Sequence, residues 1–438
     1  MGLGATGMSC ARFLYAQGTA FSVVDTRAAP PGLDTLRKEM PDVRVFTGEI
    51  PVEILDGASE VVVSPGIALD DPLISHAREA GAQVVGDIDL FVRAAQAPVV
   101  GITGSNAKST VTSLVGEMAH QAGLNTGVGG NLGTPALELL APGRQLYVLE
   151  LSSFQLERAG PLDLAVATVL NLTADHLDRH GSLPAYHKAK HQIFRGCRAA
   201  VVNRDDPLTI PLVPADVDVI SWRMREPELD GFGLRQVDED EYLCRGFEPL
   251  LPVRELSLTG RHNIANALAA LALGSCIDLP LEAMLTTLRH FRGLPHRCEF
   301  VAELRGIRFI NDSKGTNVGA TEAALRGLGS EGDIVLIAGG QGKGADFSTL
   351  AGVVARHCKL VVLIGEDAPL LQQALSPHAP VQPAASMDEA VRIASAAAAA
   401  GDTVLLSPAC ASFDMFSGYA ARGEAFRASV ADLAGGAL

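Results

Sequence analysis

Short apolar runs that end at polar or glycine-rich loops recur along the chain, with helical patterns between them. Residues 98–102 form such a run, which stops at the polar stretch 103–110 before a helical pattern that begins near Val111. In the C-terminal third, four further apolar runs end in the same way, at residues 311, 338, 364 and 406. Strands that alternate with helices predict an α/β fold with a mainly parallel sheet.

Three domains are predicted from this pattern and from the length of 438 residues. Residues 1–96 form a small Rossmann-like α/β domain, and residues 97–293 form a P-loop-type domain with a mainly parallel sheet. Residues 294–438 begin at a Gly-Leu-Pro-His linker and form a Rossmann-like, doubly wound domain.

The polar stretch after the central strand, Thr-Gly-Ser-Asn-Ala-Lys-Ser-Thr, is a candidate phosphate loop. Backbone N–H groups at the helix start would face an anion, Lys108 would add a positive charge, and the hydroxyl of Ser109 or Thr110 would ligate Mg²⁺. The stretch lacks the Gly six residues before the lysine, and Ala107 replaces the usual Gly directly before it. A polar strand-to-helix turn with a solvated lysine is the alternative.

Two further polar groups follow predicted strands. Glu150 lies near the end of an apolar run, where an ionised carboxylate is costly to bury unless a cation such as a metal ion lies beside it. His176 lies in the polar loop 175–180 after another strand. A solvated acid and a solvated turn are the alternatives. Because ligands of open α/β sheets bind at the carboxyl ends of strands, we expect both residues near the phosphate loop.

The N-terminus carries a G-x-G-x-x-G motif at residues 2–7, a helical pattern and a strand that ends at Asp25. In dinucleotide-type folds such glycines close the turn after the first strand, and the acid lies near a ribose. Met1 directly precedes the motif, so we expect the usual first strand to be missing. The motif alone leaves a nucleotide site and a plain glycine-rich turn open.

Charge and cysteine usage narrow the class of protein. A net charge of −15 argues against binding to nucleic acids or acidic membranes. The seven cysteines are scattered, without a C-x-x-C pair or zinc-ligand spacing. No signal sequence and no run of roughly 20 apolar residues is present. We therefore expect a cytoplasmic protein with reduced thiols, no zinc and no membrane span.

Seven further strings occur in order along the chain: SPGI (64–67), GGNLG (129–133), ELSSFQLE (150–157), DHLD (175–178), HR (296–297), DSK (312–314) and SPACAS (407–412). With the phosphate loop, they resemble the Mur ligase family, the ATP-dependent amide ligases of peptidoglycan precursor synthesis, over essentially the whole chain. ELSSFQLE together with SPACAS indicates the branch that adds D-glutamate.

The resemblance implies that ATP phosphorylates the terminal carboxylate of UDP-N-acetylmuramoyl-L-alanine and that the amine of D-glutamate then displaces phosphate. Holding a carboxylate beside a triphosphate requires cations, and two Mg²⁺ ions are implied, without NAD. We also expect a monomer whose C-terminal domain closes on its substrates.

The resemblance further implies residue roles. Lys108, Glu150, His176 and Lys190 would be catalytic, and the metal ligands would be Ser109, Glu150, His176 and a carbamylated Lys190. The other implied contacts are to ATP (Gly104, Ser105, Asn106, Ala107, Lys108, Ser109, Thr110, Asn263, Asn266, Arg297 and Asp312), to the UDP substrate (Ala5, Thr6, Asp25, Thr26, Arg27, Ser64, Gly66, Asn131 and His176) and to D-glutamate (Thr316, Lys343, Ser412 and Tyr419).

Three alternatives remain at this point. A sister ligase would add a different group to a muramoyl peptide or to a folate. A nicotinamide-dependent oxidoreductase would explain the glycine motif and Asp25, but not Lys108, Glu150 and His176. A ligand-binding protein without activity would follow from the missing first strand.

Overall fold

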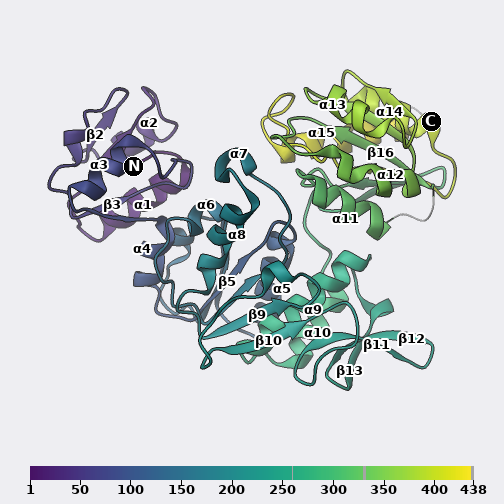
Figure 1. The fold of residues 1–438 in the computed structure, drawn as a ribbon, viewed down its shortest axis with the longest axis horizontal. Helices are drawn as coiled ribbons and strands as arrows, with labels where there is room; N and C mark the ends of the chain where they lie inside the picture. The colour runs from purple at the N-terminus through teal and green to yellow at the C-terminus, as the bar shows by residue number, and fades with distance from the viewer. Residues whose placement is uncertain (259, 329–331, 436–438) are drawn as a thin grey trace. The chain divides into compact units, whose positions relative to one another are not determined.

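The computed structural model describes residues 1–258, 260–328 and 332–435, which form two compact units (Figure 1). Unit 1 comprises Met1–Leu172, Pro184–Glu255 and Asn266–Arg289. Unit 2 comprises Thr173–Leu183, Leu256–Ala265 and the described part of His290–Leu438. Each unit is described by itself below. Among the described residues, no helix combines the length and the apolar character needed to cross a membrane.

The N-terminal part of unit 1 contains two separate two-stranded parallel sheets. One pairs β1 (Ser22–Asp25) with β2 (Arg44–Thr47), and the other pairs β3 (Glu60–Val62) with β4 (Gln83–Val85). The helices of this part are α1 (Ala5–Ala16), α2 (Leu33–Glu39), η1 (Val52–Leu55), α3 (Pro72–Glu79) and α4 (Asp87–Ala94).

No strand precedes the glycine motif in the described structure; Met1 and Gly2 lie between the two small sheets. The Gly2 N–H donates to the carbonyl of Val24 at 2.8 Å, and the Ser64 N–H donates to the carbonyl of Met1 at 3.0 Å. The expected Rossmann-like first domain therefore contains two separate sheets, which share an apolar cluster that includes Val24 and Val61 and are both hydrogen-bonded to its first two residues.

The centre of unit 1 is a nine-stranded sheet of order β13-β12-β11-β10-β9-β8-β5-β7-β6. Neighbours from β6 to β11 run parallel, and the last two strands are antiparallel. Residues of β5 are all buried, as expected for a strand covered on both faces. The strands are β5 (Val99–Thr103), β6 (Thr126–Gly130), β7 (Leu146–Glu150), β8 (Val166–Val169), β9 (Ala199–Asn203), β10 (Asp218–Trp222), β11 (Phe232–Val237), β12 (Asp240–Arg245) and β13 (Glu248–Pro252).

The helices that accompany these strands lie between or after them in sequence. They are α5 (Lys108–Gln121), η2 (Ala136–Leu139), α6 (Ser153–Leu156), α7 (Leu177–His180), α8 (Leu183–His191), η3 (Gln192–Phe194), η4 (Pro207–Thr209), η5 (Val253–Glu255), α9 (Arg261–Cys276) and α10 (Leu281–His290). Of these, α7 and the first residues of α9 belong to unit 2. The predicted strand–loop–helix order around the phosphate loop is thus confirmed as β5, loop and α5.

Unit 2 is built on a six-stranded sheet of order β14-β15-β19-β16-β17-β18, in which only β14 is antiparallel. The strands are β14 (Glu299–Leu304), β15 (Ile307–Asn311), β16 (Ile334–Gly339), β17 (Cys358–Ile364), β18 (Val381–Pro383) and β19 (Thr403–Leu406). The helices are α11 (Val318–Leu328), η6 (Phe347–Leu350), α12 (Ala351–His357), α13 (Ala368–Leu375), α14 (Met387–Ala397) and α15 (Tyr419–Gly435).

Helices cover both faces of this sheet. Ile334 and Leu336 of β16 share one core with α11, α12 and α13, whereas Val335 and Ile337 share another with α14 and α15. Because alternate strand residues point to opposite faces, this division confirms the doubly wound arrangement. Helix α14 ends at Ala397, and the Ala399 N–H beyond it donates to Asp402 Oδ2 at 2.6 Å.

Candidate active site

The phosphate loop leads from β5 into the N-terminus of α5. Lys108 folds back over the loop, and its Nζ donates to the carbonyls of Gly104 and Ser105, both at 2.9 Å. Asn171, which follows β8, fastens the loop from the neighbouring strand: its Oδ1 accepts from the Asn106 N–H at 2.8 Å. The loop therefore presents N–H groups and a lysine at the start of a 14-residue helix, which suits a phosphate.

Ala107 is strained in this loop. Its φ is +66°, in the left-handed region that favours glycine, and it directly precedes the first residue of α5. A left-handed conformation costs a non-glycine residue roughly 1–2 kcal/mol. Glycine is usual at this position because it adopts a left-handed φ without strain. This chain keeps the left-handed conformation with an alanine.

Glu150 lies at the carboxyl end of β7 and is 3 % exposed. Its Oε2 accepts a short hydrogen bond from the Ser109 hydroxyl, and its Oε1 accepts from Asn131 Nδ2 at 2.6 Å. The alternative of a solvent-facing acid is therefore wrong. A hydroxyl and a carboxylate are oxygen ligands of the kind that Mg²⁺ uses beside substrate phosphates, so this pair fits the expected metal.

Lys190 projects from α8 into the loop and is 1 % exposed. Its Nζ donates to Gly104 O at 2.8 Å and to Thr103 Oγ1 at 3.2 Å, and it lies 4.7 Å from the centre of the Tyr186 ring. Lys190 thus belongs to the same site as Lys108 and Glu150. Its carbamylation stays a prediction.

Most of the expected UDP-substrate residues lie around the glycine motif; the exceptions are Asn131, which binds Glu150, and His176, which belongs to unit 2. Asp25 accepts from the Leu3 N–H at 2.7 Å and from Arg27 at 2.6 and 2.9 Å. Hydrogen bonding from Arg27 lowers the pKa of Asp25 to about 2. Ser64 Oγ donates to Gly2 O at 3.3 Å, and Ala5 and Thr6 begin α1. The structure brings these residues together, with Thr26 next to Asp25 and Gly66 in the loop after Ser64.

Arg158 was assigned no role from the sequence. It follows α6, is buried, and donates to carbonyls of the loop after β3: those of Ser64 (2.7 Å), Pro65 (3.2 Å) and Ile67 (3.0 Å). Its Nε donates to Phe154 O at 2.7 Å. Arg158 therefore connects the segment after Glu150 with the loop that carries Ser64 and Gly66. Its position directly after ELSSFQLE was the only signal in the sequence.

Unit 2 holds a second group of predicted site residues around Asp175. Asn317 Nδ2 donates to Asp175 Oδ2 at 3.0 Å, and Lys343 Nζ lies 3.7 Å from Oδ1. His176 Nε2 lies 3.6 Å from Asp175 Oδ2. Because His176 belongs to unit 2 and Glu150 and Lys190 belong to unit 1, their shared metal site stays a prediction.

Asp312 is buried at the end of β15. It accepts from Ser407 Oγ at 2.7 Å and from the Cys298 N–H at 3.2 Å. Burial raises the pKa of Asp312 to about 6, although the neighbouring charge of Arg297 opposes this rise. The predicted pair of Arg297 and Asp312 thus lies together in unit 2.

Arg422 organises the loops that hold the predicted D-glutamate residues, and it too was assigned no role from the sequence. It is 1 % exposed and donates to Ser313 O at 2.8 Å, Ser313 Oγ at 3.0 Å and Cys410 O at 3.1 Å. These bonds join the DSK and SPACAS strings, which lie about a hundred residues apart in sequence.

The remaining predicted residues fall on the same loops or on α9. Ser412 is buried in the SPACAS loop, and the ring of Tyr419 lies 3.8 Å from Lys314 Nζ. The Thr316 N–H donates to Lys314 O at 2.8 Å. Asn263 and Asn266 lie three residues apart on α9, but belong to unit 2 and unit 1 respectively.

No group of three His, Cys, Asp or Glu side chains within the described ranges is arranged to hold a metal ion. Mg²⁺ in nucleotide enzymes is commonly held by one or two carboxylates together with phosphate oxygens and water. The Ser109–Glu150 pair therefore remains a suitable place for it.

Three family models together cover most of the chain. Residues 1–86 match the Mur ligase MurD-like N-terminal domain, residues 102–274 match the Mur ligase middle domain, and residues 296–410 match the Mur ligase glutamate ligase domain.

Curated relatives match along nearly the full length. A UDP-N-acetylmuramoylalanine--D-glutamate ligase of Pseudomonas syringae pv. syringae is 54% identical over 432 residues, which are 98% of this chain and 96% of that protein. The ligase of the same name from Pseudomonas aeruginosa is 53% identical over 436 residues, or 99% and 97% of the two chains.

Solved structures show the same fold at low sequence identity. UDP-N-acetylmuramate-alanine ligase MurC from Thermotoga maritima superposes with a TM-score of 0.62 at 18% identity, covering 99% of this chain and 98% of that one. A pseudomurein peptide ligase type C from Methanothermus fervidus also gives 0.62, at 17% identity and 98% coverage of both chains. Family models, relatives and fold agree over most of the chain, which belongs to the Mur ligase family.

Proposed function

We propose that this protein is an ATP-dependent ligase that joins D-glutamate to UDP-N-acetylmuramoyl-L-alanine in peptidoglycan precursor synthesis. The observation that carries the proposal is the buried Ser109–Glu150–Asn131 group beside a lysine-bearing phosphate loop. The relatives of that name, at 53–54% identity over nearly the full length, support the choice of substrates.

The reaction divides between residues of the two units. The loop N–H groups, Lys108 and Thr110 bind the triphosphate, and Mg²⁺ held by Ser109 and Glu150 would neutralise its charge. The alanine carboxylate attacks the γ-phosphorus of ATP, releasing ADP and forming an acyl phosphate. The amine of D-glutamate then attacks the acyl carbon, and phosphate leaves as the amide forms.

The substrates are assigned to separate loops. The glycine turn, Asp25, Arg27 and Ser64 bind the UDP part, and Asn131 reaches toward the muramoyl-alanine part. Lys343, Ser412, Thr316 and Tyr419 bind D-glutamate, whose two carboxylates need a cation such as Lys343. Arg297 and Asp312 contact the ATP ribose and phosphates, with Asn263 and Asn266 near the base.

The second Mg²⁺, with His176 and a carbamylated Lys190 as ligands, forms the finer part of this proposal. A carbamate replaces the positive charge of Lys190 with a negative one, so the group becomes an oxygen ligand instead of a donor to Gly104. The protein acts as a cytoplasmic monomer with domain boundaries at 96/97 and 293/294.

Phosphate release measured with a panel of substrates tests the proposal. We expect release only when ATP, UDP-N-acetylmuramoyl-L-alanine and D-glutamate are all present, and at least about a hundredfold loss with Glu150→Gln. Glu157→Gln, on the same segment, is the matched control, because Glu157 forms an ion pair with Arg158 rather than a contact with Ser109. Release that ignores D-glutamate, or that prefers another amino acid, would contradict this function and favour a sister ligase.

A nicotinamide-dependent oxidoreductase no longer explains the site. Asp25 is bound to Leu3 and Arg27, and the phosphate loop, Glu150 and Lys190 would have no role in hydride transfer. Titration calorimetry with NAD and NADH tests this exclusion. Binding of either at micromolar affinity would support an oxidoreductase again.

A further inference from the structure

The first turn of α4 and the segment after β7 meet in a buried polar contact within unit 1. Asp87, Asp89 and Gln155 are 3 %, 6 % and 4 % exposed, so their polar atoms depend on one another and on the backbone for hydrogen bonds. Gln155 Nε2 donates to Asp87 Oδ2 at 2.9 Å, and the Gly160 N–H donates to Asp89 Oδ1 at 2.8 Å. These four residues are called the α4–α6 joint below.

Close packing accompanies these hydrogen bonds. A Cβ atom at Gly86, which directly precedes α4, would lie 3.0 Å from Arg158 Cγ. Arg158 in turn donates to the carbonyls of the loop that carries Ser64 and Gly66. The joint therefore connects three features of unit 1: helix α4, this loop, and the segment that follows Glu150.

Gln155 links Asp87 to the end of β7. Gln155 Oε1 accepts from the N–H and from the Oγ of Ser152, both at 3.1 Å, and the Gln155 N–H donates to Ser152 Oγ at 3.2 Å. This capping box starts α6 two residues after Glu150. Because Asp87 binds the nitrogen of the Gln155 amide, it keeps the amide oxygen turned toward Ser152. Without Asp87 the amide has no buried acceptor to hold it in this orientation.

Asp87 uses only one of its two carboxyl oxygens. Within the described ranges, its Oδ1 is buried and has no hydrogen-bond partner. Burial raises the pKa of Asp87, although the hydrogen bond from Gln155 opposes this rise. An amide of the same shape would offer Gln155 the same acceptor. Asp89 differs, because its Oδ2 accepts from the Gly86 N–H at 2.8 Å while its Oδ1 accepts from Gly160, so both of its oxygens are needed.

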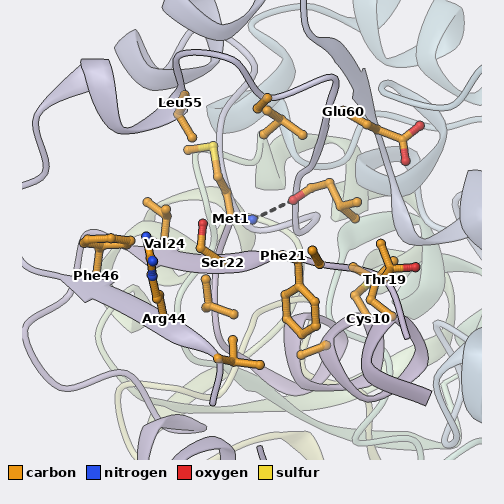
Figure 2. A pocket seen from close by; sticks show the side chains of 18 of the residues that line it. Met1, Cys10, Thr19, Phe21, Ser22, Val24, Arg44, Phe46, Leu55 and Glu60 are labelled. Carbon is orange, nitrogen blue, oxygen red and sulfur yellow. Dashed lines mark hydrogen bonds between the residues drawn. The ribbon is translucent and has the colours of Figure 1, made fainter. Parts of the chain in front are cut away.

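Helix α1, which follows the glycine turn, contacts α4. Cys10 of α1 lines the pocket shown in Figure 2, and the pKa of its thiol is raised to about 12, mainly by burial and further by the proximity of Asp87. Asp87 thus lies near α1 as well as near Gln155. A displacement of α4 would therefore shift the helix that begins at the glycine turn relative to the segment after Glu150.

We propose that Asp87 is a positioning residue for the ligase reaction, which acts through Gln155 and fixes the UDP-binding loops relative to Glu150 and the phosphate loop. This role rests on the proposed function, in which the alanine carboxylate must reach the γ-phosphorus of ATP from a separate set of loops. A misplacement of about 1 Å between reacting groups can cost about a hundredfold in rate. Loosening the joint therefore lowers kcat, whereas each substrate keeps the loops that bind it.

Three variants test this role in phosphate-release kinetics on the full chain. Asp87→Leu removes the acceptor for Gln155, and we expect kcat to fall at least about tenfold while the KM values for ATP and the UDP substrate stay within about threefold. Asp87→Asn keeps the acceptor and should leave kcat within about threefold. Asp89→Asn turns an amide N–H toward a backbone N–H, so its kcat should fall as in Asp87→Leu.

Further measurements separate positioning from a loss of stability. Met284→Ala, at a buried position of α10 outside the joint, is the matched control: its thermal midpoint should fall by several degrees, but its kcat should stay within about twofold. Hydrogen exchange over residues 152–160 should be at least about tenfold faster in Asp87→Leu and Asp89→Asn, and unchanged in Asp87→Asn. The calorimetric affinity for the ATP analogue AMP-PNP should stay the same in all of these variants.

Several results would overturn the positioning role. These are a kcat of Asp87→Leu within about threefold of the wild type, an equal loss in Asp87→Asn, and a loss in Met284→Ala that matches its fall in midpoint. A raised KM with an unchanged kcat would assign the joint to substrate binding instead. If Asp87→Leu does not fold, Gln155→Met removes the same hydrogen bond from the other side and must lower kcat in its place.

The wild type separates this role from the proposed function. If its phosphate release requires ATP, the UDP substrate and D-glutamate together, an unchanged kcat in the Asp87 variants refutes the positioning role alone. If its release lacks this requirement, the proposed function and the positioning role are both wrong, whatever the hydrogen exchange of the joint.

Discussion

Replacing Arg158 with alanine tests whether the segment after Glu150 holds the loop of Ser64 and Gly66 in place. The arginine is 6 % exposed, and its guanidinium donates to carbonyls across residues 64–67 as well as to Phe154 O. Alanine removes all of these donors, and it also leaves Glu157, 2.9 Å from Arg158 Nη2, without this ion pair.

The cost follows from the bonds that are lost. A hydrogen bond from a charged group contributes about 1.5–3 kcal/mol, and the two bonds of 2.7 Å are the strongest here. The loop carbonyls are only partly buried, so water replaces some of the donors and about 3 kcal/mol remains as the expected loss of unfolding free energy. Arg158→Lys keeps the charge but not the fork of donors, so about half of that loss is expected.

Urea unfolding and steady-state kinetics measure the two consequences. We expect the KM for the UDP substrate to rise about tenfold, which corresponds to about 1.4 kcal/mol, while kcat changes less than threefold, because the proposed function places the UDP part of the substrate on this loop, away from the reacting atoms. Arg195→Ala, at an exposed arginine whose guanidinium donates to Gln192, is the matched control and should change neither quantity. A stability loss below about 0.5 kcal/mol with an unchanged KM would refute this reasoning.

Three other changes test the site and its supports. Lys190→Ala should lower activity about a hundredfold and be partly rescued by short carboxylic acids in a phosphate-release assay; full activity without added acid would discard carbamylation. The pKa of Asp312 is raised from 3.8 to about 6, so its contribution to the unfolding free energy is full below pH 3.8 and is lost as the pH rises to about 6. Urea titrations should therefore show the wild type losing about 3 kcal/mol of unfolding free energy over this range relative to Asp312→Asn. If the two proteins lose stability in parallel, burial does not raise this pKa. Arg422→Met should lower the unfolding free energy in the same titrations by about 3–5 kcal/mol, because it removes the donors that join Ser313 to Cys410. The control Arg427→Met, at an exposed position of α15, should lower it by less than about 0.5 kcal/mol.

Local patterns were enough to locate the strands, the phosphate loop and the family. A continuous apolar run followed by small polar residues predicts the order of β5, the loop and α5. Glu150 was identified because an acid inside an apolar run needs a partner. These features depend on neighbours within about ten residues, and the sequence displays those directly.

Contacts between distant segments were decided only by the tertiary structure. Arg158 and Arg422 received no role from the sequence, because several of their acceptors are backbone carbonyls about a hundred residues away, and any residue type can supply a carbonyl. The left-handed φ of Ala107 depends on how the loop closes onto Asn171. Sequence determines the elements locally, whereas hydrogen bonds between main-chain groups become visible only when the chain is folded.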